Sequence, residues 1–363
     1  MEHLGDCDYS PLFLLFLYKF CHRTKYKEGD FVVSEIILEY TRGGHVENIH
    51  RADVVAVNTK GEILKEVGNG KLPMFWRSAA KPFQALAFVK NGGMEKYGLT
   101  ERELALLVSS HSGEGFHVEL VKGILDKLGL TTDALNCGAA RPMSGKANVE
   151  LIKQGERPQA VHNACSGKHS QILALCQMMG LPIEGYIKPD HPAEKIIFQH
   201  VAMASCMPED KLEIGIDGCG VPVFYLPLDH MARAYARLGS PAKGDWGEYE
   251  AAALRIRNAM AENPDALAGT GRIDTAISQI TKGRVIAKIG ADAVYCMAVR
   301  DEDMGIAFKV EDGSYGAVNP AVMAVLKYMD ILTKDEYDQL QAKYPPVLKN
   351  HRGDIIGTIE YKL

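Results

Sequence analysis

The chain has 363 residues, of which 47% are hydrophobic and 24% are charged, and its formal net charge is −5. This composition excludes a disordered or fibrous chain. The chain is also long enough for one large core or two lobes. The slightly acidic balance disfavours nucleic acid as a partner, so a small-molecule substrate is expected. No run approaches the ~18 apolar residues of a membrane span. The 8 cysteines have no tight disulfide spacing, which predicts a reducing, cytoplasmic setting.

The first thirty residues differ from the rest of the chain. Residues 11–18 form a short apolar block, but Glu2, Asp6 and Asp8 stand where a secretory leader carries positive charge. We interpret residues 1–30 as an appended segment outside the fold, with a peripheral membrane tether or a true leader as alternatives. Residues 31–363 are then predicted to form one domain with two lobes.

Short antiparallel strands are predicted after residue 31. Apolar and β-branched residues recur in four short runs, with turns at Gly43-Gly44 and Lys60-Gly61 between them. The predicted strands cover residues 36–40, 46–50, 54–57 and 63–64.

A helix is predicted from Ser78 to Val89, and its first turn carries a hydroxyl and an amine. Pro82 cannot donate an N–H to the carbonyl of Ser78, so the helix begins no later than this point. Ser78 and Lys81 are three residues apart and share a helix face, where a desolvated lysine can act as the base for a serine nucleophile. Alternatively, Ser78 is only a helix cap.

The middle of the chain is predicted to be helical. A capping box at Thr100 and Glu103 opens an apolar helix, which ends in the polar cluster 109–115. Strands return at 285–289, 293–299, 306–310 and 354–361, so we expect an antiparallel sheet made from both chain ends, with an inserted helical lobe. The other predicted helices are 116–129, 146–154, 167–179, 192–206, 229–239, 249–262, 317–329 and 334–342.

Lys288 lies inside the apolar strand 285–289. A lysine there must face a polar site or an open sheet edge. Lys-x-Gly on a strand is the partner that serine enzymes of the Ser-x-x-Lys type place opposite their nucleophile. A solvent-facing lysine at a sheet edge is the alternative.

Two further clusters present a cysteine beside ionisable groups. Cys165 precedes Lys168 at the start of a predicted helix, and Cys219 follows Asp217 in a glycine-rich turn. Thiolates are stabilised and metals are held at such places. The spacing by itself does not define a zinc motif, and buried structural cysteines are the alternative.

Together these clusters resemble the Rhizobium etli-type L-asparaginases, the asparaginase II family. The resemblance begins near residue 31 and runs nearly to the end of the chain. The motifs that carry it are 42–48, Arg77–Pro82, Ser110-His111-Ser112, Cys165–His169, Asp217-Gly218-Cys219 and Lys288–Asp292.

The resemblance implies an α/β fold akin to serine β-lactamases and glutaminases, a homodimer, and hydrolysis of L-asparagine to L-aspartate and ammonia by the catalytic domain 31–363. It implies two Ser–Lys pairs, Ser78 with Lys81 and Ser110 with Lys288. It also implies Zn²⁺ bound by Cys165, Lys168 and Cys219, with water completing the shell. The candidate substrate-binding residues are Arg77, His111, Asp217 and Arg272.

Two other functions remain open from the sequence. One is a penicillin-recognising acyl-transfer enzyme that uses the same Ser-x-x-Lys chemistry. The other is a non-catalytic metal-binding or redox protein that works through Cys165 and Cys219. The chain departs from the resembled family at residues 112–114, which leaves the preference between asparagine and glutamine open.

Overall fold

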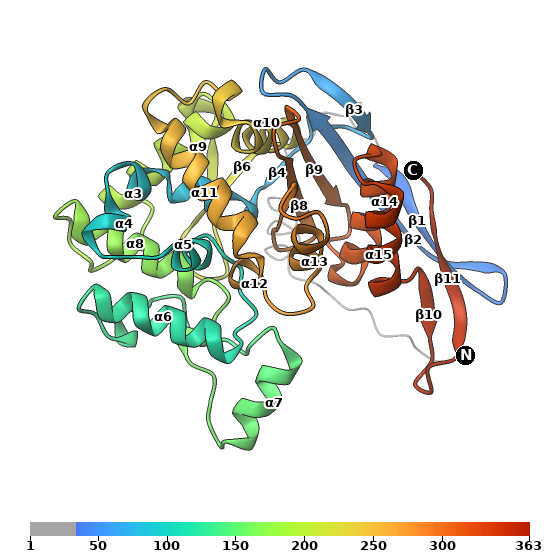
Figure 1. Cartoon of the computed structure of the whole chain (residues 1–363), viewed down its shortest axis with the longest axis horizontal. Helices are drawn as coiled ribbons and strands as arrows, with labels where there is room; N and C mark the ends of the chain where they lie inside the picture. The colour runs from blue at the N-terminus through green and yellow to red at the C-terminus, as the bar shows by residue number, and fades with distance from the viewer. Residues whose placement is uncertain (1–33) are drawn as a thin grey trace, which may run out of the picture. The chain divides into compact units, whose positions relative to one another are not determined.

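An antiparallel sheet of eight strands is the centre of the structure, a computed structural model that describes residues 34–363. The appendage predicted at residues 1–30 lies outside the described residues. The spatial order is β10-β11-β1-β2-β9-β8-β7, and β3 also pairs with β2 (Figure 1). The strands are β1 (Glu35–Arg42), β2 (His45–Val57), β3 (Ile63–Val67), β7 (Val285–Ile289), β8 (Val294–Val299), β9 (Met304–Val310), β10 (Val347–Lys349) and β11 (Ile355–Tyr361).

The two ends of the described chain meet in this sheet. Leu38 of β1 lies opposite Tyr361 of β11, and Val54 of β2 lies opposite Phe308 of β9. The predicted α/β class, with an antiparallel sheet assembled from both chain ends, is confirmed.

Helices cover both faces of the sheet. Val285, Ala287 and Ile289 of β7 pack in one core with α13 (Ile273–Ile280), α14 (Val318–Met329) and α15 (Lys334–Lys343). Ile286 points to the opposite core, where α10 (Leu228–Gly239) lies against the sheet. Because side chains alternate along a strand, Lys288 shares the face of Ile286 and points toward the helical lobe.

The inserted lobe lies between β3 and β7 in the chain and contains a second, three-stranded sheet in the order β4-β6-β5 (Figure 1). Its strands are β4 (Pro73–Phe75), β5 (Glu213–Ile216) and β6 (Pro222–Pro227). Its helices are α2 (Lys81–Gln84), α3 (Leu86–Lys90), α4 (Gly93–Lys96), α5 (Glu101–Leu107), α6 (Gly115–Lys127), α7 (Gly145–Lys153), α8 (Ser166–Met178), α9 (Pro192–Ser205), α11 (Glu250–Glu262) and α12 (Pro264–Leu267).

The structure corrects several predicted elements. The strands predicted at 46–50 and 54–57 are one strand, β2, because Asp53 stays inside it by accepting hydrogen bonds from Ser34 Oγ and Asn69 N, both at 2.8 Å. The helix predicted over 78–89 is divided into a 3₁₀ turn, η1 (Arg77–Ala80), and the short helices α2 and α3. The capping box at the start of α5 is confirmed.

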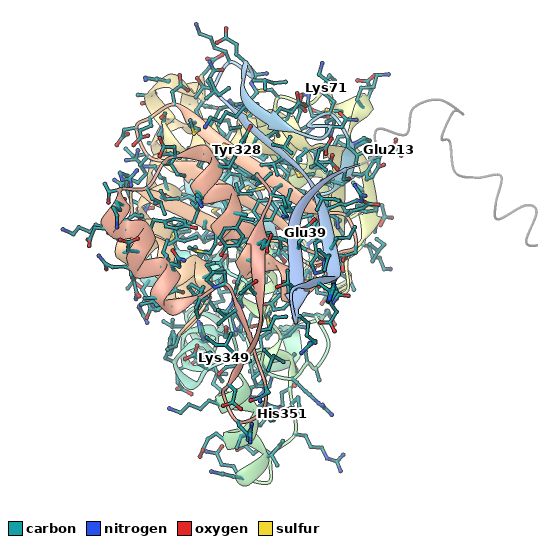
Figure 2. The ribbon with its side chains drawn as sticks, turned by 90° about the vertical axis from the view of Figure 1, so that its right-hand side faces the viewer. Glu39, Lys71, Glu213, Tyr328, Lys349 and His351 are labelled. Carbon is teal, nitrogen blue, oxygen red and sulfur yellow. The ribbon has the colours of Figure 1, made fainter. Side chains whose placement is uncertain are left out.

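Charged side chains lie on the side of the large sheet that β10, β11 and β1 form. Figure 2 shows this side, with Glu39 of β1 and Lys349 of β10 labelled. Lys362 Nζ lies 2.7 Å from a Glu39 oxygen and 2.8 Å from Glu360. Among residues 34–363, no helix has the length and apolar character needed to cross a membrane. The 6 cysteines that the structure describes are all free of disulfides.

Candidate active site

Six of the predicted site residues meet at one cavity of 420 Å³. Its walls come from η1, the loop after α5, the start of α8, the β5–β6 turn and the segment after β7. These segments are far apart in the sequence, so the cavity exists only in the folded domain. The predicted residues that line it are Arg77, Ser78, Ser110, Cys165, Asp217 and Cys219.

The backbone at Arg77 turns sharply before Ser78. Arg77 has a φ of 54°, a left-handed conformation that costs a non-glycine residue roughly 1–3 kcal/mol. Its guanidinium is held by Asp217, with Nε 2.9 Å from Oδ1, and by Asp292. Within residues 34–363 the half-buried Ser78 hydroxyl has no hydrogen-bond partner, so it is free to meet a ligand in the cavity.

The Lys81 side chain is buried and points at the second serine. Its Nζ donates to Ser109 O at 2.6 Å, to Ser110 Oγ at 3.1 Å and to Cys165 Sγ at 3.4 Å. The structure therefore brings Lys81 to Ser110, whereas it forms no hydrogen bond between Lys81 and Ser78, the two residues that the resemblance pairs.

The Lys288 side chain reaches the same hydroxyl from β7. Its Nζ lies 2.7 Å from Ser110 Oγ and 2.8 Å from Ile289 O, which brings the predicted pair of Ser110 and Lys288 together. Burial and the positive charge of Lys81 hold the pKa of Lys288 well below its ordinary value. A neutral Lys288 amine can accept the Ser110 proton while it donates one of its own hydrogens to the Ile289 carbonyl.

Ser110 Oγ thus lies between the amines of two buried lysines, Lys81 and Lys288. It can receive a proton from Lys81 and pass its own proton to Lys288 without moving, because both amines are within hydrogen-bond distance. The three side chains therefore form a continuous hydrogen-bonded chain beside the cavity.

A sulfur-rich cluster lies next to Lys81 at the same cavity. Cys165 Sγ, Cys219 Sγ and an Asp217 carboxylate oxygen all lie within 4.8 Å of one another. Lys168 Nζ is buried at 3.1 Å from Cys219 Sγ and 3.8 Å from Asp217 Oδ2. Two sulfurs with a nitrogen or an oxygen at these separations form a donor set that zinc accepts.

Charge is unevenly distributed within this cluster. The hydrogen bond with Cys219, together with the charges of Lys81 and Lys168, holds the pKa of Cys165 well below its ordinary value. Burial raises the pKa of Asp217, but Lys168 and Arg77 outweigh it and lower the pKa to about 2. Asp217 and Cys165 are therefore the members of the cluster whose negative charge the protein favours, and the amine of Lys168 lies beside Asp217 and Cys219.

Gly167 sets the position of α8 and of its two candidate ligands. A Cβ at this residue would lie 2.1 Å from the Leu106 carbonyl oxygen of α5, a separation that atoms do not adopt. Only glycine therefore allows the start of α8 to approach α5 this closely, and that approach carries Cys165 and Lys168 to the cavity.

Two predicted substrate-binding residues do not line the cavity. His111 is fully buried, with Nε2 2.8 Å from Ser166 Oγ and Nδ1 accepting from Gly113 N at 3.1 Å. Arg272 lies 3.6 Å from Asp274 and 3.9 Å from the sulfur of Met143. His111 therefore supports the fold of the loop after α5, and Arg272 approaches the cavity only through Met143.

Several cavity residues were not among the predicted site residues. Asp292 belongs to a motif that the resemblance used, and its contact with Arg77 joins the end of β7 to η1. Asn163 stands two residues before Cys165, whereas Met143 and Tyr315 belong to no pattern that indicated chemistry, so only the fold reveals those two. These lining residues include Met143, Asn163, Asp292 and Tyr315.

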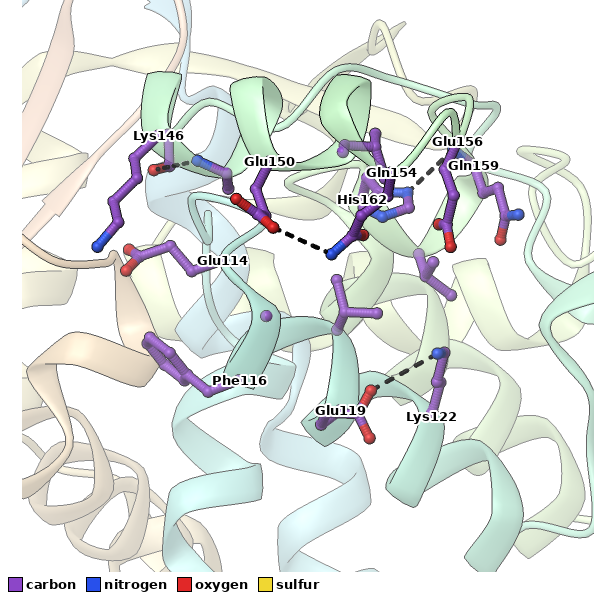
Figure 3. A pocket seen from close by; sticks show the side chains of 17 residues that line it. Glu114, Phe116, Glu119, Lys122, Lys146, Glu150, Gln154, Glu156, Gln159 and His162 are labelled. Atoms are coloured by element: carbon purple, nitrogen blue, oxygen red, sulfur yellow. Dashed lines mark hydrogen bonds and ion pairs between the residues drawn. The ribbon is translucent and has the colours of Figure 1, made fainter.

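A larger hollow of 550 Å³ lies between α6 and α7. Figure 3 shows the carboxylates of Glu114, Glu119 and Glu150 and the amines of Lys122 and Lys146 around it. It shares no lining residue with the cavity of 420 Å³, and none of the predicted site residues lines it. We therefore assign the chemistry to the smaller cavity, where the serines and lysines meet.

Comparisons with known proteins agree with the motifs. The sequence profile of L-asparaginase II matches residues 38–361, whereas no curated protein shows significant similarity to the chain. A crystal structure of Mglu matches with 14% identity over 78% of this chain and 68% of that chain, at a TM-score of 0.36. Mglu in its glutamate form matches with 14% identity over 78% and 62%, at 0.37. A beta-lactamase from Mycobacterium bovis matches with 13% identity over 76% and 94%, at 0.36.

These structural likenesses are too weak to bear on activity. The family match is different, because it covers the sheet, the helical lobe and every segment that lines the cavity. The chain belongs to the L-asparaginase II family.

Proposed function

We propose that this amidohydrolase hydrolyses the side-chain amide of L-asparagine to L-aspartate and ammonia, as the Rhizobium etli-type enzymes that it resembles do. The observation that carries the proposal is the position of Ser110 Oγ between Lys81 Nζ at 3.1 Å and Lys288 Nζ at 2.7 Å, beside a free Ser78 hydroxyl. Acyl transfer needs a nucleophile and a route for its proton, and this cavity supplies both.

Ser78 is the proposed nucleophile. Lys81 passes a proton to Ser110 Oγ, and Ser110 passes its own proton to Lys288. The neutral Lys81 amine then turns to Ser78 and takes the hydroxyl proton as Ser78 Oγ bonds to the amide carbon. The proton on Lys288 returns through Ser110 to the leaving nitrogen, so ammonia departs and leaves an ester on Ser78. Water cleaves this ester and releases aspartate.

Charges at the cavity fit the zwitterionic end of an amino acid. Asp217 stays ionised, since its pKa is lowered to about 2 by Lys168 and Arg77 against the effect of burial, and it suits the substrate's ammonium group. Arg77 suits the α-carboxylate. Both side chains line the cavity within reach of Ser78.

The decisive measurement is ammonia release from a panel of amides. We expect L-asparagine to be the fastest substrate, L-glutamine to be slower, and the β-lactam nitrocefin to remain intact. Nitrocefin turnover without ammonia release from any amide would contradict the proposal and favour a penicillin-recognising enzyme.

The sulfur-rich cluster is the proposed zinc site, with Cys165, Cys219 and Lys168 as ligands and water completing the shell. Bound zinc would supply a Lewis acid beside the substrate. Lys168 coordinates only as a neutral amine, whereas Cys165, Cys219 and Asp217 raise its pKa despite burial, so metal must displace a proton there.

Metal analysis tests this site. Protein purified without chelators should contain about one zinc per chain, and Cys165→Ala and Cys219→Ala should each lose it. Cys176→Ala is the matched control, because Cys176 is a buried cysteine of the same helix, α8, outside the cluster. Full zinc content in both cluster variants would rule out these ligands.

We also propose the homodimer that the resemblance implies. A solution mass of twice 39.8 kDa would support it, and a monomer at working concentration would contradict it.

A further inference from the structure

Asp274 is a buried acid near the site that has no part in the proposed reaction so far. It lies in the first turn of α13, and its Oδ1 atom accepts a hydrogen bond from Ile289 N at 3.0 Å. Its Oδ2 atom has no hydrogen-bond partner within residues 34–363, and the Arg272 guanidinium lies 3.6 Å away. An unsatisfied buried polar group costs roughly 1–3 kcal/mol, so stability alone does not explain why an acid occupies this position.

The peptide of Ile289 lies at the edge of the large sheet. β7 is the last strand in the sheet order, so it has a partner strand on one side only. Gly290 N donates toward β8, and the N–H and carbonyl of the preceding Ile289 therefore face the open side. Asp274 accepts from this N–H, and Lys288 Nζ donates to this carbonyl at 2.8 Å. Two charged side chains thus take the places that a further strand would fill.

The Ile289 carbonyl orients the Lys288 amine. A neutral amine has two N–H groups and one lone pair, and the carbonyl takes one of those N–H groups. Ser110 Oγ lies 2.7 Å from the same nitrogen, where the lone pair can accept its proton. Because one nitrogen makes both contacts, a displacement of the Ile289 peptide would move the Lys288 amine relative to Ser110. Asp274 holds the other side of that peptide.

We propose that Asp274 is a positioning residue, which fixes the Lys288 amine against Ser110 through the peptide of Ile289. The inference rests on the proposed hydrolysis, in which Lys288 takes the proton of Ser110. Proton transfer needs donor and acceptor within about 3 Å, and a displacement of about 1 Å can lower a rate by about a hundredfold. Asp274 itself does not line the cavity of 420 Å³, so it acts on the reaction only through Lys288.

Two purely structural roles explain the contacts of Asp274 less well. Acids in the first turn of a helix stabilise the helix dipole, but that role requires neither burial nor a contact with another element. An ion pair with Arg272 is the second, yet neither Arg272 Nη2 nor Asp274 Oδ2 makes a hydrogen bond within residues 34–363. The contact at hydrogen-bond distance is the one with Ile289 N, which favours the positioning role.

The charge of Asp274 also acts on Lys288. Burial and the charge of Lys81 lower the pKa of Lys288, whereas the carboxylate of Asp274 opposes this effect. Loss of the carboxylate charge should therefore lower the pKa of Lys288 further. The charged or titratable groups that face the Lys288 amine from the surrounding elements are Lys81, Cys165, Arg272, Asp274 and Cys296.

Steady-state ammonia release from L-asparagine tests the positioning role. We expect Asp274→Ala to lower kcat at least about thirtyfold and to leave KM within about twofold, because the lost group does not touch the substrate. Asp274→Asn keeps an acceptor for Ile289 N and should retain kcat within about fivefold of wild type. A kcat for Asp274→Ala within about threefold of wild type, or no recovery in Asp274→Asn, would overturn the proposal.

Ser278→Ala is the matched control. Ser278 is a buried residue of the same helix, and its hydroxyl donates to Ala261 O at 3.1 Å, so this variant also loses one buried hydrogen bond of α13. It should keep the wild-type kcat. A loss of kcat equal to that of Asp274→Ala would show that α13 acts only through its stability, and would refute a specific role for Asp274.

The titration of Lys288 tests the same contact without a substrate. Nuclear magnetic resonance of the isotope-labelled lysine side chains follows it, and Lys288→Gln identifies its signal. We expect a lower pKa for Lys288 in Asp274→Asn than in wild type or Ser278→Ala. An unchanged pKa in folded Asp274→Asn would refute the inference even if Asp274→Ala does not fold. If wild type releases ammonia from no amide but shows the shift, the hydrolysis is refuted and the action of Asp274 on Lys288 is supported.

Discussion

Replacing Ser78 by alanine is expected to reduce ammonia release from L-asparagine by at least about a thousandfold, a loss of roughly 4 kcal/mol of transition-state stabilisation. The substitution removes the proposed nucleophile and disturbs nothing else, because the Ser78 hydroxyl has no hydrogen-bond partner within residues 34–363. Thermal unfolding of the variant should match wild type. Steady-state ammonia release and a melting curve are the two measurements.

Ser110→Ala is the comparison that separates the roles of the two serines. This variant keeps Ser78 but removes the hydroxyl through which the proposed relay moves protons during acylation, so ammonia release should also fall, and intact-protein mass analysis of a quenched reaction should detect no accumulated acyl adduct. If Ser78→Ala keeps more than about a tenth of the activity while Ser110→Ala loses all of it, the nucleophile is Ser110.

Replacing Glu194 by glutamine should stabilise the protein at alkaline pH. Burial raises the pKa of Glu194 from 4.5 to about 8, so the contribution of this group to stability is complete below 4.5 and is lost as the pH rises through about 8. Between about pH 5 and about pH 8 the wild type should lose roughly 3–4 kcal/mol of unfolding free energy through this group, whereas glutamine has no proton to lose.

Urea unfolding at the two pH values measures the effect as a difference between wild type and variant. The exposed Glu209→Gln substitution is the control and should follow the wild-type pH profile. Parallel loss of stability in wild type and Glu194→Gln would show that Glu194 ionises normally in the folded protein. That result would contradict the raised pKa of Glu194.

The regular elements of this fold were predictable where apolar periodicity is strong. Strands β7, β8 and β9 and helices α6, α8 and α9 fall close to their predicted bounds. Strand β6 was not predicted, because its first and last residues, Pro222 and Pro227, indicate an interruption of regular structure rather than a strand. Helix α13 was also missed, since its eight residues depend on packing against β7 more than on their own pattern.

The site was predictable in its residue types but less so in its contacts. The spacing of Ser78 and Lys81 indicated a shared face, yet the direction of Lys81 is set by Ser109 O and Ser110 Oγ, which only the fold brings close. Lys288 is 178 residues away from Ser110, and no local pattern specifies such a pair. Glu194 has an ordinary helical sequence context, so its burial without a partner was not predictable.

The pairing of β1 with β11 has a consequence for how the protein is made. Strands β1, β2 and β3 can pair with one another early, but β11, the other neighbour of β1, and β9, the other neighbour of β2, are translated only when synthesis is almost finished. Contacts of such long range slow folding, since a large loop must close before they form. A nascent chain halted before β7 would hold the Ser78 segment but neither Lys288 nor the late partners β9 and β11, and its exposed strand edges would make it a client for chaperones.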